Sequence, residues 1–121
     1  MNLQIETRLS DQLARYLDLT VSETRLTAAN MANIDTPGYQ TLGIDFASEM
    51  RDAMVGIDAG RSMQTARVNV VDGLIARPDG NNVSMDREGL RLAEEQLKFK
   101  AGVALLHLEN QRVMDAIHVD K

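Results

Sequence analysis

The stretch that decides the fold is residues 85–117, MDREGLRLAEEQLKFKAGVALLHLENQRVMDAI. Four apolar side chains recur in it at intervals of seven residues: Leu92, Phe99, Leu106 and Val113. A seven-residue period is typical of a helix that pairs with another helix in a left-handed coil. Ser84 stands where it can cap the first turn. The pattern therefore predicts one long helix over 85–117, with these four side chains as its main packing row.

A second apolar row runs beside the first. Its members are Leu90, Leu97, Ala101, Ala104, Leu105 and Leu108. Such a helix would be about 50 Å long, and its apolar arc is wider than one partner helix covers. Contiguous apolar surface that stays exposed usually marks an interaction site. The periodicity alone leaves two alternatives: a subunit whose second row packs against neighbouring chains, or an ordinary helical domain whose middle segment covers that row.

The spacing of apolar residues over 8–33 predicts a second long helix. Apolar side chains follow spacings of three and four residues there: Leu9, Leu13, Tyr16, Leu17, Val21, Ala28 and Met31. The same side carries three threonines: Thr20, Thr24 and Thr27. They lower the intrinsic helix propensity but let another helix approach closely. Thr7 or Ser10 is placed to cap the start, without a capping box. We expect Leu13 and Leu17 to pack against the main row of the other helix.

Residues 34–84 differ in composition from the two predicted helices, because they contain both prolines and most of the glycines. We expect a short helix over 45–54, a strand over 67–71 and turns at the two Asp-Gly pairs that follow. The predicted fold is mainly α, with two long terminal helices that pair like a coiled coil and a loop-rich middle segment with little β. Residues 1–33 and 85–121 would then form one helical assembly domain.

Composition excludes several classes of protein. The chain has 121 residues, a formal net charge of −5 and no Cys. Thiol catalysis, disulfides and thiolate metal sites are therefore absent. Acidic and basic residues are interspersed, so there is no basic footprint for nucleic acid. No stretch approaches the roughly 18 apolar residues of a transmembrane helix. The first residues lack the basic and apolar regions of a secretory signal peptide.

Candidate catalytic residues are sparse. His107 and His118 are the only histidines, and they lie outside any metal-binding frame. Four glutamates are spread along the last helix: Glu88, Glu94, Glu95 and Glu109. Their Lys and Arg neighbours indicate a solvated or inter-subunit charge face, with pairs such as Glu94 and Lys98. We expect no catalytic residue, no cofactor and no metal site.

The most specific run is ANMANIDTPGY at residues 29–39. Two asparagine amides three residues apart can bond the free carbonyls of a last helical turn or a neighbouring chain. A Thr-Pro pair then leaves the helical region, and Pro-Gly fits a turn after which the tyrosine can fold back. Six positions would set this helix exit: Asn30, Asn33, Thr36, Pro37, Gly38 and Tyr39. By itself the run is more simply interpreted as a well-made stop signal of the helix.

The order Asn-x-x-Asn-x-x-Thr-Pro-Gly-Tyr at the end of an N-terminal helix resembles the signature of bacterial flagellar rod and hook proteins. Two further runs strengthen the resemblance: IDF at 44–46, and DGNNVSMDRE at 79–88 followed by LAEEQL at 92–97. Glu95 stands where that family commonly has Asn, and Phe99 where it often has Tyr. Those two departures affect particular contacts of the last helix.

The resemblance implies a structural subunit of the proximal part of the basal-body rod, in which terminal helices of many subunits form a coiled-coil-like layer. Its partners would be copies of itself, other rod proteins, the basal-body protein FliE and the export gate, near the inner membrane but not spanning it. It also implies export without a cleaved signal peptide and assembly in the periplasm. The rival hypothesis is a soluble helical adaptor or chaperone that binds a peptide between its two long helices.

Overall fold

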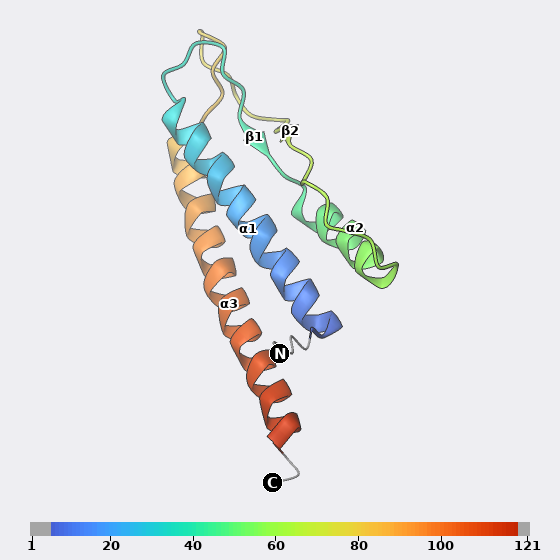
Figure 1. The fold of residues 1–121 in the computed structure, drawn as a ribbon. Coiled ribbons are helices and arrows are strands. Elements are labelled where there is room, and N and C mark those ends of the chain that lie inside the picture. Colours follow the sequence, from blue (N-terminus) through green and yellow to red (C-terminus); the bar gives the residue numbers. More distant parts are fainter. Residues whose placement is uncertain (1–5, 119–121) are drawn as a thin grey trace.

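The computed structural model describes residues 6–118, so the outermost parts of the two expected terminal units, 1–5 and 119–121, lie outside the described residues. It contains three helices and two short strands: α1 Arg8–Ala32, β1 Leu42–Gly43, α2 Phe46–Asp58, β2 Asn69–Val70 and α3 Met85–His118. Helices α1 and α3 lie side by side in opposite directions, and α2 flanks the other side of α1 (Figure 1). The predicted mainly α fold with two long terminal helices is confirmed.

Helix α1 begins with a reciprocal cap. The Ser10 backbone N–H donates to Thr7 Oγ1 at 3.0 Å, and the Thr7 N–H donates to Ser10 Oγ at 2.9 Å. The expectation that no capping box is present was wrong. Serine replaces the Glu or Gln that usually closes such a box, and its hydroxyl is long enough to reach back to the cap residue.

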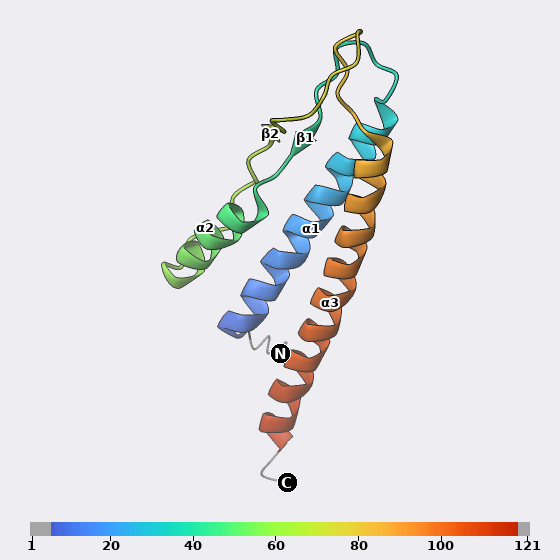
Figure 2. The same cartoon turned by 180° about the vertical axis from the view of Figure 1, so that it is seen from behind.

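The middle segment contains more helix and less strand than the sequence predicts. Helix α2 has Asp45 as its N-cap, with the side chain accepting from the Ser48 N–H at 3.1 Å. It continues four residues beyond the expected end, to Asp58, and Gly60 follows with a φ of +68°. The expected strand over 67–71 is reduced to β2, which pairs antiparallel with β1. Figure 2 shows both strands on the path that carries the chain back along α1.

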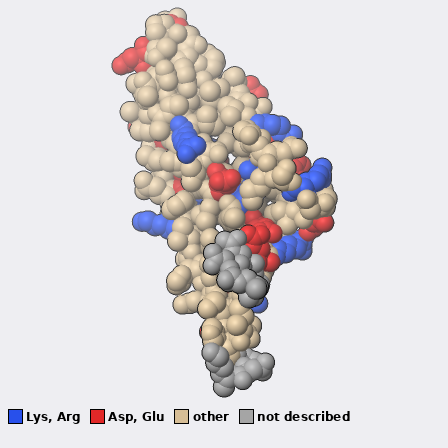
Figure 3. Space-filling model, viewed as in Figure 1, with Lys and Arg blue, Asp and Glu red and all other residues tan. Residues whose placement is uncertain are grey.

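The core of the single chain is thin. Only four apolar side chains of the described residues are buried: Leu13, Leu19, Ile44 and Val83. Many large apolar side chains are exposed instead, above all along α3. Figure 3 shows charged side chains gathered around α2, while the lower part of α3 is mostly uncharged on the face in view. None of the described helices is both long and apolar enough to cross a membrane. One chain therefore buries little of its own apolar surface.

Candidate assembly surface and helix-exit cluster

The face of α3 that meets α1 is polar. Four positions seven residues apart are its buried residues: Glu88, Glu95, Gly102 and Glu109. We call these four positions the inner seam. The glutamates expose only 1%, 2% and 6% of their surface, so the expectation of a solvated charge face was wrong for all three. Glu94, one residue from the seam, is exposed as expected.

Each buried glutamate is held by a donor from α1 or its cap. The donors and distances are Asn30 Nδ2 to Glu88 Oε2 at 3.1 Å, Thr27 Oγ1 to Glu95 Oε1 at 2.7 Å, and Thr7 Oγ1 to Glu109 Oε1 at 2.9 Å. Buried carboxylates are tolerated when hydrogen bonds satisfy them. Because these pairs occur near both ends of α1, they specify one alignment of the two helices.

Gly102 provides the closest approach of the two helices. A Cβ atom at this position would lie 2.7 Å from Leu17 Cδ2 and 3.1 Å from Tyr16 Cδ1. Those distances are below van der Waals contact, so a larger residue would push the helices apart. The absence of a side chain at one inner-seam position thus lets α1 pack directly on the α3 backbone.

The start of α2 joins the helix pair through Phe46. Its ring meets Tyr16 of α1 edge to face at 5.2 Å, and Lys98 Nζ of α3 lies 4.1 Å from its centroid. Lys98 also binds the buried Glu23 of α1 at 3.1 Å, and Arg91 approaches the same carboxylate at 3.6 Å. The predicted pair of Lys98 with Glu94 is therefore replaced by a contact between helices.

Glu95 is the one glutamate of the inner seam with a buried oxygen that lacks a hydrogen-bond partner in the described chain. This oxygen is Oε2. Desolvation raises the pKa of this carboxyl above its ordinary value of 4.5, and the nearby Glu23 adds to the rise, against the hydrogen bond from Thr27. A buried carboxyl with one free oxygen is thus the site where the pairing depends most on pH.

The expected packing residues lie at the centre and the edge of this interface. Leu13 is buried, and Leu17 packs over Gly102. On α3, Leu92, Leu106 and Val113 are half-buried beside the inner seam, and Phe99 remains 43% exposed. Sequence reasoning missed the glutamates as the buried row. The signal was present, since they share the seven-residue spacing of their apolar neighbours.

The second apolar row stays uncovered. We call it the outer row, and it consists of Leu90, Leu97, Ala101, Ala104, Leu105 and Leu108, all of which are exposed. Leu90 and Leu97 expose 64% and 70% of their surface. Leu97 lies two residues beyond Glu95 and therefore about 200° around the helix from the inner seam. The middle segment packs on α1, so it does not cover this row (Figure 2).

Near the end of α1 and the start of α3, the side chain of Asn30 joins three parts of the chain. Its Oδ1 accepts from the Tyr39 hydroxyl at 3.1 Å and from the Leu42 N–H at 3.0 Å. Its Nδ2 donates to the Leu42 carbonyl at 2.9 Å as well as to Glu88. Asn30 is 1% exposed. One buried amide thus connects the end of α1, the returning chain and the first turn of α3.

The two sequence runs meet in the same region. The amide of Asn81, which is fully buried, donates to the carbonyls of Asn33 and Thr36 at 2.9 and 2.8 Å. The Gly38 N–H donates to the Asp79 carbonyl at 2.9 Å. Gly38 has a φ of +74°, which suits the expected turn after Pro37. We call this group, with the six predicted positions, the helix-exit cluster.

Comparison with known proteins assigns the class. No protein-family model matches the chain. A protein of Salmonella typhimurium is 34% identical over an alignment of 122 positions, which covers 84% of this chain and 86% of that protein. One of Escherichia coli is 31% identical over 119 aligned positions, with the same shares, and one of Cereibacter sphaeroides is 32% identical over 128 aligned positions, which cover 92% of this chain and 97% of that protein.

Each of these relatives is named a flagellar basal body rod protein. The chain therefore belongs to the class of flagellar rod proteins, in agreement with the resemblance that its helix-exit run carries. Within that class it belongs to the FlgB family.

Proposed function

We propose that this chain is a non-enzymatic subunit of the proximal rod, which assembles helically with copies of itself and with other rod proteins to build a torque-transmitting shaft. The observation that carries the proposal is the outer row of α3. It is a continuous apolar row at helical spacing on the side of α3 away from α1, and nothing in the described chain covers it.

The energetics favour a partner helix on the outer row. Burying a leucine side chain contributes about 1.5–3 kcal/mol, and all four leucines in the row expose more than half of their surface: Leu90, Leu97, Leu105 and Leu108. Ala101 and Ala104 alternate with them, so a neighbouring helix could approach closely. In this proposal the inner seam aligns α1 with α3 within a subunit, and the outer row binds the next subunit.

The wider setting follows from the family. We infer partners among the other rod proteins, FliE and the export gate, a position in the periplasmic rod near the inner membrane, and export without a cleaved signal peptide. In this proposal, residues 1–33 and 85–121 act as the helical assembly unit, and 34–84 supply outer contacts. The helix-exit cluster would hold the chain path at the junction of these parts, and no cofactor or catalytic residue is involved.

The adaptor hypothesis requires a peptide groove between the two long helices. In the described residues, α1 and α3 contact each other directly through the inner seam. The cavity between them, near Glu23 and Glu95, holds only about 10 Å³. A peptide does not fit such a space, so the rod proposal has the stronger support.

The test is a single charge on the outer row. We expect Leu97→Asp to abolish rod assembly and swimming in a strain that lacks its own copy of the gene, because the new carboxylate would be buried against the neighbouring subunit. The matched control is Gln96→Asp, which adds the same charge at an adjacent exposed position outside the row.

The unfolding free energy of dilute Leu97→Asp should stay within about 0.5 kcal/mol of the unmodified chain, since the side chain is exposed there. Normal swimming by the Leu97→Asp strain would contradict the proposal. Hydrogen exchange that becomes slower along α3 as concentration rises would support assembly. Slow exchange that is independent of concentration would favour the adaptor.

A further inference from the structure

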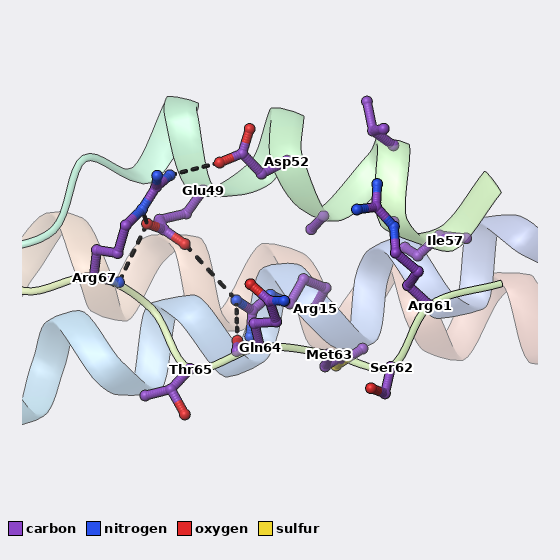
Figure 4. Close-up of a pocket in the computed structure, with 13 residues that line it drawn as sticks. Arg15, Glu49, Asp52, Ile57, Arg61, Ser62, Met63, Gln64, Thr65 and Arg67 are labelled. Atoms are coloured by element: carbon purple, nitrogen blue, oxygen red, sulfur yellow. Dashed lines mark hydrogen bonds and ion pairs between the residues drawn. The ribbon is translucent and has the colours of Figure 1, made fainter. Parts of the chain in front are cut away.

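One cavity of the described chain lies away from the helix pair. It has a volume of about 310 Å³ and is enclosed by α2, the segment 61–67 and one side chain of α1, Arg15 (Figure 4). Ligand sites in proteins start at about this size. Its walls combine guanidinium groups with apolar side chains of α2 and of the segment, among them Ile57 and Met63.

Arg15 brings a buried positive charge to this cavity, and its ion pairs with carboxylates are long. The residue is 6% exposed. Of its donors, Nη2 bonds the Gln64 carbonyl at 2.7 Å, while Nε is buried without a partner among the described residues. The carboxylates of Asp18 and Glu49 lie 3.9 and 4.0 Å from its terminal nitrogens, beyond hydrogen-bond distance. A guanidinium cannot lose its proton to relieve this burial.

The acidic side chains of the cavity are already engaged by another arginine. Arg67 donates from Nε to Glu49 Oε1 at 2.8 Å and pairs through Nη2 with Asp52 (Figure 4). Arg61, on the opposite side of the opening, has no ion pair with any residue in 6–118. Two guanidinium groups therefore face one cavity with no carboxylate hydrogen-bonded to either.

We propose that this cavity binds a carboxylate on a short aliphatic body. The carboxylate accepts from the Arg15 guanidinium, with Arg61 as the second cation, and the aliphatic part packs against Ile57 and Met63. Planar guanidinium groups recognise carboxylates with directional, charge-assisted hydrogen bonds. The carboxylate belongs either to a free dicarboxylic acid or to a glutamate side chain of an adjoining polypeptide. This inference goes beyond the assembly proposal, because occupancy is measured on the single chain.

The experiment follows the side-chain Nε–Hε signals of ¹⁵N-arginine-labelled full-length chain by NMR. One arm titrates glutarate, and a second titrates N-acetyl-glutamate α-amide, which presents the same carboxylate as a residue of a chain. Glutaramide and sodium chloride at matched ionic strength are the controls. We expect the Arg15 and Arg61 signals to shift saturably with the carboxylates and not with the controls.

Binding of glutarate alone identifies a free dicarboxylate as the ligand, and binding of both probes identifies a glutamate side chain. We expect Arg15→Lys, which keeps the charge but loses the planar donors, to weaken binding about tenfold or more. Arg61→Gln at the exposed rim tests the same site without disturbing a buried residue, and it should weaken binding too.

The matched control is Arg25→Lys, at an exposed position of the same helix. It should leave the affinity unchanged. No saturable shift with either carboxylate, or a shift equal to that caused by sodium chloride, would overturn the proposal. So would unchanged affinity in Arg61→Gln.

Discussion

The two faces of α3 reverse the usual arrangement of an amphipathic helix. The inner seam, which is buried against α1, consists of three glutamates and a glycine, whereas the exposed outer row consists of leucines and alanines. A helix of a self-contained domain normally turns its apolar side inward. The reversal supports the proposal that α3 packs against neighbouring subunits.

The inner seam and the outer row also differ in what they contribute. A buried carboxylate costs desolvation that its hydrogen bonds only offset, so such pairs specify alignment more than they add stability. A leucine row is non-directional, and its burial contributes free energy with any well-fitting partner. In the proposed assembly, the inner seam would select the register within the subunit, and the outer row would supply the driving force for association.

The largest effect on the dilute chain is expected where the inner seam meets the helix-exit cluster. Asn30→Ala removes four hydrogen bonds and leaves Glu88 without that donor, so the unfolding free energy should fall by about 3 kcal/mol. Urea unfolding followed by far-UV circular dichroism measures it. Asn110→Ala, at an exposed position of α3, should change the value by less than about 0.5 kcal/mol. Equal changes in unfolding free energy for the two variants would show that the helix-exit cluster does not stabilise the pair of α1 and α3.

Two glycine-to-alanine substitutions should change stability by a smaller amount, with opposite signs at an exposed position and at an inner-seam position. Gly89→Ala has nothing within 4 Å of the new Cβ and should stabilise the chain by about 1 kcal/mol through helix propensity. Gly102→Ala should destabilise it by about 1 kcal/mol or more, because Leu17 and Tyr16 must move. Thermal unfolding of both variants gives the comparison. Stabilisation by both would mean that the helices do not approach closely at Gly102.

The smallest expected effect is the pH dependence of the stability that Glu95 contributes. Because burial raises the pKa of Glu95 in the folded chain, its carboxyl keeps a proton that the unfolded chain has released. The contribution of Glu95 to folding stability is therefore full at low pH, and it is lost as the pH rises above 4.5 through the raised pKa. Glu95→Gln should gain stability relative to the unmodified chain over that rise, in urea unfolding at several pH values. Glu94→Gln, which is exposed, is the control. Parallel curves for both variants would contradict the assigned pKa shift.

Local sequence signals were sufficient to predict the two long helices. The two long helices were predicted over 8–33 and 85–117 and are found at Arg8–Ala32 and Met85–His118. Periodicity, caps and the Pro-Gly stop act within a few residues, so they can be recognised without the fold. The short middle elements were less well predicted, because β2 depends on a partner strand that is distant in the sequence.

The sequence by itself determined two long terminal helices, a helix exit at residues 29–39 and an apolar row too wide for one partner. Hydrophobicity alone predicted an apolar packing row for α3 and missed the glutamate-glycine row that repeats every seven residues beside it. The tertiary structure buries the glutamate-glycine row most deeply and leaves Leu92, Leu106 and Val113 half-buried beside it. The physical reason is that donors on α1 and its cap satisfy the glutamates and Gly102 lets the backbones approach.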